Sequence, residues 1–338
     1  MATYLDTEPY PDRVLDEGDQ ALAHALQING RASFREIAAV LGVSDQTVAR
    51  RWARLRSAGT LRLLGLTAPF RLGDSLWLVR VRCTPDAAAP IGEALARRTD
   101  TTWVQLVSGG TEISCVVRTR DGTPADARVL QRLPRTPRVV DMSAHCLLHI
   151  YYGHDLGPIN KRGPLTPDQA AALTRDPTPR PPAEPQPPAL LDHADRLLLD
   201  ALARDGRTPA AELAATTGLS PSTVRRRITE LRTSGVLYFD LEYHPSLLHR
   251  HFRAGLWLEI APASLSAAGT ALAAHPEVAF AAATTGTTNI YASVDVPDAQ
   301  HFYRYLTHSI ATLPGLHHTI TTPTHQTLKG AGPYAGGG

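Results

Sequence analysis

Two short segments of this chain place polar side chains and arginines at a spacing suited to reading DNA. The segments read SDQTVARR from Ser44 and SPSTVRRR from Ser220. On a helix, small polar groups in the first turn and arginines one turn later can enter the major groove and recognise base edges. Flanking arginines and the positive helix end would hold phosphates. The expected partner is therefore double-stranded DNA.

The residues expected to contact DNA share an outward position on these two helices. They are Ser44, Gln46, Thr47, Arg50, Arg51 and Arg54 in the first helix, and Ser220, Ser222, Thr223, Arg225, Arg226 and Arg227 in the second. A rotation of about 100° per residue turns apolar side chains to the opposite face, towards a core. Those are Val48, Trp52 and Leu55 in the first helix, and Val224, Ile228 and Leu231 in the second. Solvated surface arginine is the alternative interpretation, but the same frame occurs twice.

Helix-start and turn signals precede each segment. In the first copy Asp16 can cap a helix ending near Gly30, and Ser33 with Glu36 forms a capping box. Gly42 then makes a tight turn before Ser44 caps the third helix. In the second copy the expected signals are Thr208 as N-cap with Pro209 at the first helical position, Gly218 at the turn, and Ser220 as cap with Pro221 following. Both patterns predict a helix-turn-helix.

The two segments belong to a duplicated unit. Leu15-Asp16 aligns with Leu191-Asp192, and the match runs without a gap to Leu61 aligned with Leu237. Self-similarity of this length indicates an internal repeat. Between the copies, the Pro-rich stretch from Pro177 to Pro188 predicts an extended spacer. Residues 165–175 before it could form a short helix capped by Thr166.

A βαββαβ rhythm follows each helix-turn-helix and predicts a ferredoxin-like sandwich. In the first copy the expected strands cover residues 76–83, 103–107, 113–119 and 139–151, with helices at 87–98 and 125–133. In the second copy the expected strands cover 254–260, 278–284, 290–296 and 318–328, with helices at 265–275 and 299–310. The helices would cover one face of each sheet and leave the other for pairing with a second such domain.

The predicted fold class is α+β, with two tandem units. Each unit is a winged-helix-like helix-turn-helix followed by a ferredoxin-like βαββαβ sandwich. The predicted boundaries are 13–62 and 190–238 for the DNA-binding domains, 74–152 and 252–329 for the sensor and dimerisation domains, and 153–189 for the linker.

Composition narrows the class of protein. The chain has 338 residues, more than one hydrophobic core normally supports, and its net charge is +2. No apolar run is long enough to span a bilayer, and the first dozen residues lack the features of a signal peptide, so a cytoplasmic location is expected. Cys83, Cys115 and Cys146 form no CxxC pair and are expected to be small core residues. The sequence predicts no metal site and no cofactor.

The sequence resembles the Lrp/AsnC family of bacterial transcription regulators, and it does so twice. The most specific match is the frame Ser44-x-x-x-Val48-x-x-Arg51, which recurs as Ser220-x-x-x-Val224-x-x-Arg227. The resemblance implies a nucleoid-associated regulator that binds DNA through this helix and self-associates through its ferredoxin-like domains. Self-association would give either an intramolecular pseudo-dimer or a homodimer. It also implies sensing of an amino acid or a related small molecule.

The expected sensing loops depart from the family pattern. The family has Gly-Asp-x-Asp between the second and third strands, whereas this chain has GGTE from Gly109 and GTTN from Gly286. The candidate effector-binding residues are Gly109, Thr111, Glu112, Gly286, Thr288 and Asn289. Glu112 is the only carboxylate in either loop, so a cationic ligand is expected to prefer the first copy.

Two other functions compete with a regulator. Some proteins that resemble this family decarboxylate tetrapyrroles, and the second copy is rich in histidine. No His/Asp or His/Cys pair recurs between the copies, so no catalytic residue is assigned and the chain is expected not to be an enzyme. An assembly protein that has lost DNA binding is the third interpretation, and the intact turn and cap signals argue against it.

Overall fold

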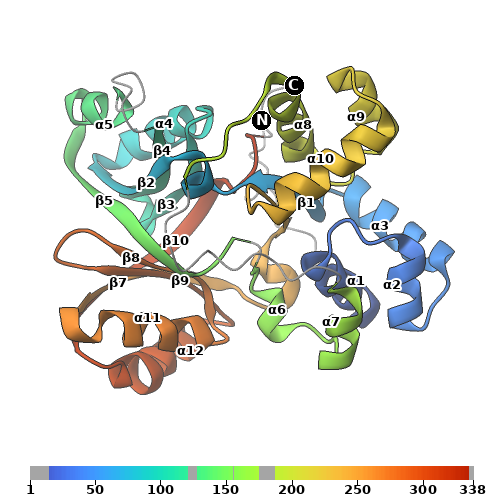
Figure 1. Ribbon diagram of the computed structural model, residues 1–338. Coiled ribbons are helices and arrows are strands. Elements are labelled where there is room, and N and C mark those ends of the chain that lie inside the picture. Colours follow the sequence, from blue (N-terminus) through green and yellow to red (C-terminus); the bar gives the residue numbers. More distant parts are fainter. Residues whose placement is uncertain (1–14, 121–127, 155, 175–186, 335–338) are drawn as a thin grey trace. The chain divides into compact units, whose positions relative to one another are not determined.

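The computed structural model describes residues 15–120, 128–154, 156–174 and 187–334, which group into two compact units (Figure 1). The unit that we call the helical unit joins residues 15–73 to residues 154–244. The other, which we call the sheet unit, joins the described residues of 74–153 to residues 245–334. Domains of the same kind from the two copies therefore pair with each other. Each helix-turn-helix packs with its counterpart, and so does each sandwich.

The first helix-turn-helix, called head 1 below, follows the predicted order. It consists of α1 (Glu17–Ile28), α2 (Phe34–Leu41), α3 (Asp45–Ser57) and β1 (Leu61–Thr67). The Ser33 hydroxyl accepts from the backbone N–H of Glu36, whose side chain accepts from the Ser33 backbone N–H, so the capping box is confirmed. Gly42 has a φ of 68°, the left-handed conformation that lets the chain turn without a Cβ penalty.

The second helix-turn-helix, head 2, has the same order with one different helix start. It consists of α8 (His193–Arg204), α9 (Ala210–Thr217), α10 (Pro221–Thr233) and β6 (Leu237–Tyr243). The prediction that Thr208 caps α9 is wrong. Pro209 has an extended ψ of 147°, so the helix begins at Ala210, and the Thr208 hydroxyl instead donates to the carbonyl of Asp205.

The two heads are joined by a two-stranded sheet that the sequence did not predict. β1 pairs antiparallel with β6, from Leu61 opposite Tyr243 to Thr67 opposite Leu237. An ion pair across this ladder joins Arg62 to Glu242 at 2.7 Å. The helical unit is thus an internal pseudo-dimer of heads.

The linker is partly helical, as predicted for residues 165–175. It contains α6 (Ile159–Arg162) and α7 (Pro167–Leu173), and the predicted cap at Thr166 is confirmed. This segment packs on head 1: the Gln169 side chain donates to the carbonyl of Val40, and the His24 ring accepts from the backbone N–H of Leu165. Most of the Pro-rich stretch lies outside the described residues.

The sheet unit closes its strands into a barrel in the order β10-β3-β4-β2-β5-β8-β9-β7. The strands of the first copy are β2 (Asp74–Cys83), β3 (Thr101–Val107), β4 (Glu112–Arg120) and β5 (Val139–Tyr152). Those of the second copy are β7 (Phe252–Ile260), β8 (Val278–Thr284), β9 (Ile290–Val296) and β10 (Leu316–Lys329). The last strand of each copy also pairs with the other copy, β5 with β8 and β10 with β3. The two sandwiches are thereby joined edge to edge.

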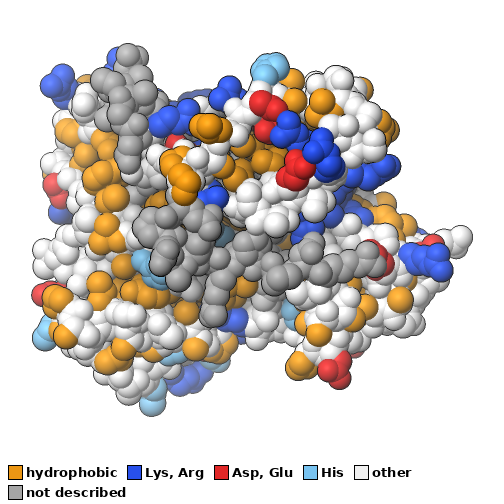
Figure 2. All heavy atoms as spheres, in the orientation of Figure 1, with side chains coloured by type: hydrophobic (Ala, Val, Ile, Leu, Met, Phe, Trp, Pro, Cys, Tyr) orange, Lys and Arg blue, Asp and Glu red, His pale blue; other side chains and the backbone are white. Residues whose placement is uncertain are grey.

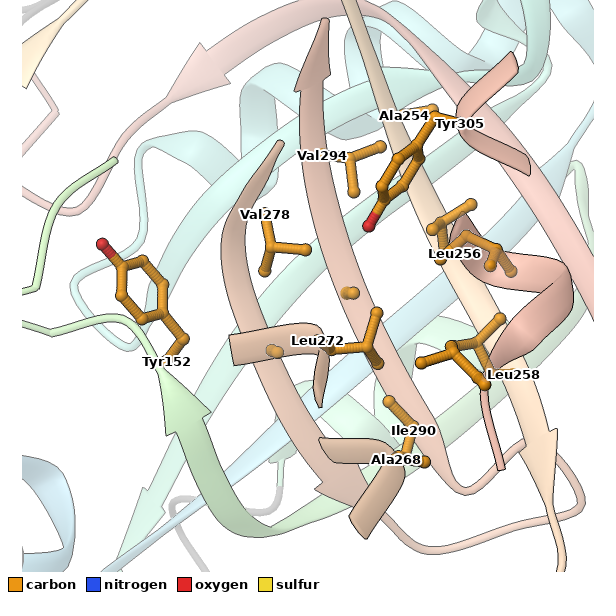
Figure 3. Packing of buried hydrophobic residues seen from close by; sticks show 14 of the residues in the cluster. Tyr152, Ala254, Leu256, Leu258, Ala268, Leu272, Val278, Ile290, Val294 and Tyr305 are labelled. Atoms are coloured by element: carbon orange, nitrogen blue, oxygen red, sulfur yellow. The ribbon is translucent and has the colours of Figure 1, made fainter. Parts of the chain in front are cut away.

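Helices cover the outside of each sheet. They are α4 (Pro85–Ala96) and α5 (Arg128–Arg132) in the first copy, and α11 (Leu265–Ala274) and α12 (Ala299–Arg304) in the second, α12 continuing through a π-helical turn at Tyr305–Ser309. Figure 3 shows Leu256 and Val294, from neighbouring strands, packing with Leu272 and Tyr305 from the helical segments. This buried apolar layer fixes α11 and α12 on the sheet of the second copy.

Candidate functional site

The third helix of each head turns an apolar face inward and a polar face outward, as predicted. Val48, Trp52 and Leu55 of α3 are at most 5% exposed. Val224, Ile228 and Leu231 of α10 are likewise buried. Basic side chains, with acidic ones beside them, gather over α10 in Figure 2. The helices that sequence analysis assigned to DNA therefore present their arginines on the surface.

In head 1, two of the three predicted DNA-contacting arginines are held by acidic residues. Arg51 Nη1 lies 2.7 Å from carboxylate oxygens of both Asp16 and Asp19. Arg54 Nη2 lies 2.7 Å from Asp19, whose side chain is only 4% exposed. The hydrogen bond from Arg51 lowers the pKa of Asp16. These contacts tie α3 to the start of α1, so Arg51 and Arg54 stabilise the head itself.

Head 2 repeats this contact in part. Arg227 Nη2 lies 2.8 Å from Asp192, and Arg227 Nη1 lies 3.7 Å from the buried Asp195. Arg226 is paired with Glu230 one turn later on the same helix, at 2.9 Å. Arg227 thus ties α10 to α8, and Arg226 has a local counter-charge.

Arg50 and Arg225 differ from these arginines. Both are exposed, and neither forms an ion pair or a side-chain hydrogen bond within the described part of the chain. Gln46 is also exposed in the first turn of α3. These three side chains have the freedom to meet a base edge or a phosphate.

The predicted hydroxyl contacts serve mainly as helix caps. Ser44 Oγ accepts from the backbone N–H of Thr47, and its hydroxyl lies 2.9 Å from that of Thr47. Ser220 does the same for Thr223, and its hydroxyl also lies 2.9 Å from that of Ser222. These groups set the start of each outward helix.

The first sensing loop forms a short turn between β3 and β4. Gly109 has a φ of 71°, with open space where a Cβ would stand, and the Thr111 hydroxyl donates to the carbonyl of Ser108. Glu112 lies 2.9 Å from Arg80 and 3.6 Å from Arg82, both on β2, and its side chain is 13% exposed. Glu112 therefore already has two counter-charges within the fold.

The second sensing loop is fixed by different contacts. Asn289 accepts from the backbone N–H of Ile260 and donates to its carbonyl, so this amide fastens the loop to β7. The carbonyl of Thr288 accepts from the Thr284 hydroxyl. At Gly286, which has a φ of 106°, a Cβ would lie 2.6 Å from the ring of His145 on β5.

Side chains that no sequence pattern predicted surround these loops. The Arg80 guanidinium lies over the Trp257 ring, 4.9 Å from its centre, and the rings of His145 and Trp257 are 5.2 Å apart. His145 Nδ1 donates to the carbonyl of Thr285. Arg80 and Trp257 come from different copies, so no pattern within one copy could reveal their contact.

The three cysteines differ in burial. Cys83 and Cys115 are buried, as expected for core residues, and Cys146 is half-buried. Burial raises the pKa of Cys115 to about 12, which keeps it a neutral thiol. Among the described residues there is no cluster of three or more His, Cys, Asp or Glu that could hold a metal ion. Nor do these residues include a helix long and apolar enough to cross a membrane.

Comparison with known proteins identifies the class to which this architecture belongs. The AsnC-type helix-turn-helix domain matches residues 15–56 and again residues 191–232, and the Lrp/AsnC ligand binding domain matches residues 254–334. The chain belongs to the Lrp/AsnC family of helix-turn-helix transcriptional regulators.

Two curated relatives each match a stretch about as long as one copy of the repeat. The HTH-type transcriptional regulator FL11 of Pyrococcus furiosus is 27% identical over 140 residues, covering 40% of this chain and 93% of the relative. An uncharacterized HTH-type transcriptional regulator of Pyrococcus horikoshii is 30% identical over 133 residues, covering 39% of this chain and 84% of the relative.

A solved structure with the same fold over the whole chain is that of an enzyme. The siroheme decarboxylase NirDL covers 95% of this chain and 94% of its own, with a TM-score of 0.64 and 12% identity. A second structure, in co-complex with an iron-uroporphyrin III analogue, has a TM-score of 0.63. The expectation that this chain is not an enzyme is therefore wrong as a flat exclusion. It was based on the lack of a recurring His/Asp or His/Cys pair, yet an enzyme has the same fold over nearly the whole chain.

Proposed function

We propose that this chain is a sequence-specific DNA-binding transcription regulator that reads duplex DNA with α3 and α10. The observation that carries the proposal is the pair of exposed arginines, Arg50 and Arg225, each on the outer face of a helix whose inner face is buried. In this proposal Gln46, Arg50 and Arg225 meet base edges. The capping serines and the paired arginines position the helices, and the N-terminal backbone of each helix holds phosphates.

Binding to genomic fragments by the full chain tests this proposal. Because phosphate contacts release counterions, affinity should fall steeply between low and physiological salt. The double variant Arg50→Ala/Arg225→Ala should lose about 1–3 kcal/mol of specific binding for each base-reading arginine. Arg304→Ala, which removes an exposed arginine of the sheet unit, is the matched control and should bind like the wild type. An affinity for DNA that does not change with salt would refute the proposal. So would an equal loss of affinity in the control and in the double variant.

We further propose that the sheet unit binds a small-molecule effector, an amino acid or a related metabolite, at the two sensing loops. The match to the Lrp/AsnC ligand binding domain in the second copy supports this. The open space at Gly109 would let a ligand approach the backbone closely. Calorimetry with a panel of amino acids and amines, followed by DNA titration with and without each binder, tests it. A regulator of this kind would act on chromosomal DNA in the bacterial cytoplasm.

The whole-chain likeness to NirDL supports a second candidate, an enzyme acting on a tetrapyrrole carboxylate. The observation behind it is the fold match alone. Incubation of the full chain with siroheme under anaerobic conditions, with mass spectrometry of the tetrapyrrole, tests it. Loss of carbon dioxide from the substrate would support the enzyme, and an unaltered substrate that leaves the protein unbound would refute it.

A further inference from the structure

We propose that the two heads read half-sites of unlike sequence, so that the DNA site of this protein is asymmetric and is bound in one orientation only. This inference rests on the proposed DNA-binding function and adds the class of operator. It follows from two structural facts taken together: the heads are fixed to each other within one chain, and their outward helix faces carry different side chains in aligned positions.

The heads are held as one body by reciprocal contacts. Besides the β1–β6 ladder, Arg31 of head 1 donates to the carbonyls of Gly206 and Thr208 of head 2. Arg207 of head 2 donates to the carbonyls of Gly30 and Ala32 of head 1. An ion pair between Arg56 and Asp205 adds a contact without a counterpart, because Asn29 stands where a symmetric acid would be. Both helices must therefore meet DNA together, as in a two-fold dimer.

The outward faces present their free arginine at different places. The aligned position of Arg225 in head 1 is Ala49, and the free arginine of head 1 stands one residue later, at Arg50. One residue along a helix is a rotation of about 100°. The aligned residue of Arg50 is Arg226, but Glu230 holds that guanidinium at 2.9 Å. The two heads would therefore direct a free guanidinium at different base pairs of their half-sites.

The polar groups near the helix starts differ as well. Gln46 in head 1 is exposed and offers both a donor and an acceptor, the pattern that recognises adenine in the major groove. Its counterpart, Ser222, has no amide, and its hydroxyl lies 2.9 Å from that of Ser220. Head 1 thus has means to read an adenine and a guanine, whereas head 2 reads through arginine alone.

A charge reversal at one position accounts for much of this difference. Arg54 of head 1 reaches back to the buried Asp19, whereas the aligned Glu230 of head 2 reaches Arg226 instead. The buried Asp195, the counterpart of Asp19, keeps one carboxylate oxygen without a hydrogen-bond partner. An arginine at position 230 would find this carboxylate in the place where Arg54 finds Asp19. Substituting arginine for Glu230 would therefore reproduce the contact between Arg54 and Asp19 in head 2 and would remove no buried contact.

Selection of bound sequences from a randomised DNA pool by the full chain tests the inference. The wild type should enrich a non-palindromic site. The variant Ser222→Gln/Arg225→Ala/Thr229→Ala/Glu230→Arg gives head 2 the outward side chains that head 1 carries from Gln46 to Arg54. It should enrich a palindrome of the half-site read by head 1. Its affinity for the wild-type site should fall about tenfold for each base pair that is now mismatched. The control Thr233→Ala, at the far end of α10, should leave the selected sequence unchanged.

The possible failures are distinct. A palindromic site selected by the wild type would overturn the inference and leave DNA binding intact. A symmetrised variant that is folded by thermal unfolding, yet still selects the wild-type sequence, would overturn the assignment of reading residues and the inference with it. Enrichment of no sequence by the wild type would overturn the proposed function itself.

Discussion

Arg31 and Arg207 occupy aligned positions in the two copies, and each donates to two backbone carbonyls of the opposite head. The four nitrogen–oxygen distances lie between 2.7 and 3.1 Å. Burial lowers the pKa of both guanidinium groups, that of Arg207 to about 10, so Arg207 remains charged at neutral pH. The Arg207 guanidinium also lies 4.6 Å from the centre of the Phe34 ring. These reciprocal hydrogen bonds, called the arginine exchange below, hold the two heads together.

Replacing either exchanged arginine should therefore destabilise the helical unit. Arg207→Ala leaves the carbonyls of Gly30 and Ala32 without their charged donors, and we expect a loss of about 2–4 kcal/mol in the free energy of unfolding. Urea titration followed by circular dichroism measures it. Arg207→Lys should recover little, because one ammonium lacks the planar fork that reaches both carbonyls. A loss no larger than that of the surface variant Arg304→Ala would contradict the exchange.

The arginines of α3 should separate into two classes. Arg50→Ala should weaken DNA binding and leave the free energy of unfolding within about 0.5 kcal/mol of the wild type. Arg51→Ala should lower the free energy of unfolding by about 1–2 kcal/mol, because the buried Asp19 would keep only Arg54 as a counter-charge. Paired measurements of unfolding and DNA affinity on both variants decide this. Equal effects of the two substitutions on stability would contradict the assignment.

Glu112 should act as a structural ion pair rather than as the counter-charge of a ligand. Glu112→Gln removes the acid between Arg80 and Arg82, and we expect a loss of about 1–3 kcal/mol in the free energy of unfolding. Glu93→Gln, which breaks an exposed ion pair with Arg97, should cost less than about 1 kcal/mol and serves as control. Calorimetry should show that any cationic amine binds both proteins equally. Loss of amine binding in Glu112→Gln alone, without loss of stability, would restore the ligand role.

The linker contact on head 1 should weaken in acid. Burial lowers the pKa of His24 below its usual value of 6.5, so the folded chain favours the neutral ring that accepts from Leu165. Protonation then favours unfolding, and the stabilisation present above pH 6.5 declines as the pH falls below it. His24→Gln keeps an acceptor without titrating and should lose less stability between pH 7.5 and 5.5.

Urea titrations at both pH values test this expectation for His24. His251→Gln, at an exposed histidine of the sheet unit, is the control and should follow the wild type. An identical loss in His24→Gln and the wild type would show that His24 does not titrate with unfolding.

Local signals in the sequence predicted the parts of the fold that local interactions determine. The Ser33–Glu36 capping box, the turn at Gly42 and the buried face of α3 at Val48 all depend on neighbours within one or two helical turns. The loops at Gly109 and Gly286 were also placed correctly between their strands. The repeat itself was visible because both copies keep the same helix frame.

Contacts between copies could not be predicted in the same way. β1 was missed because Leu63 and Leu64 are both buried, which hides the alternation typical of a strand, and its partner lies in the other copy. The pairing of Glu112 was missed because it depends on register: Arg82 lies directly opposite Glu112 in the β2–β4 ladder. Predicting such contacts requires the strand register, which sequence periodicity alone does not supply.

The ladder between β1 and β6 also changes how pairing of the heads responds to dilution. In a regulator assembled from separate subunits, the fraction of paired heads falls with protein concentration according to mass action. Here both partners are tethered in one polypeptide, so their encounter is unimolecular and its extent is the same at a few molecules per cell as at many. Because the pairing strand of each head is already occupied, exchange with related single-unit regulators in the same cell is disfavoured. Because of the duplication, pairing of the two heads does not depend on how much of a related regulator the cell contains.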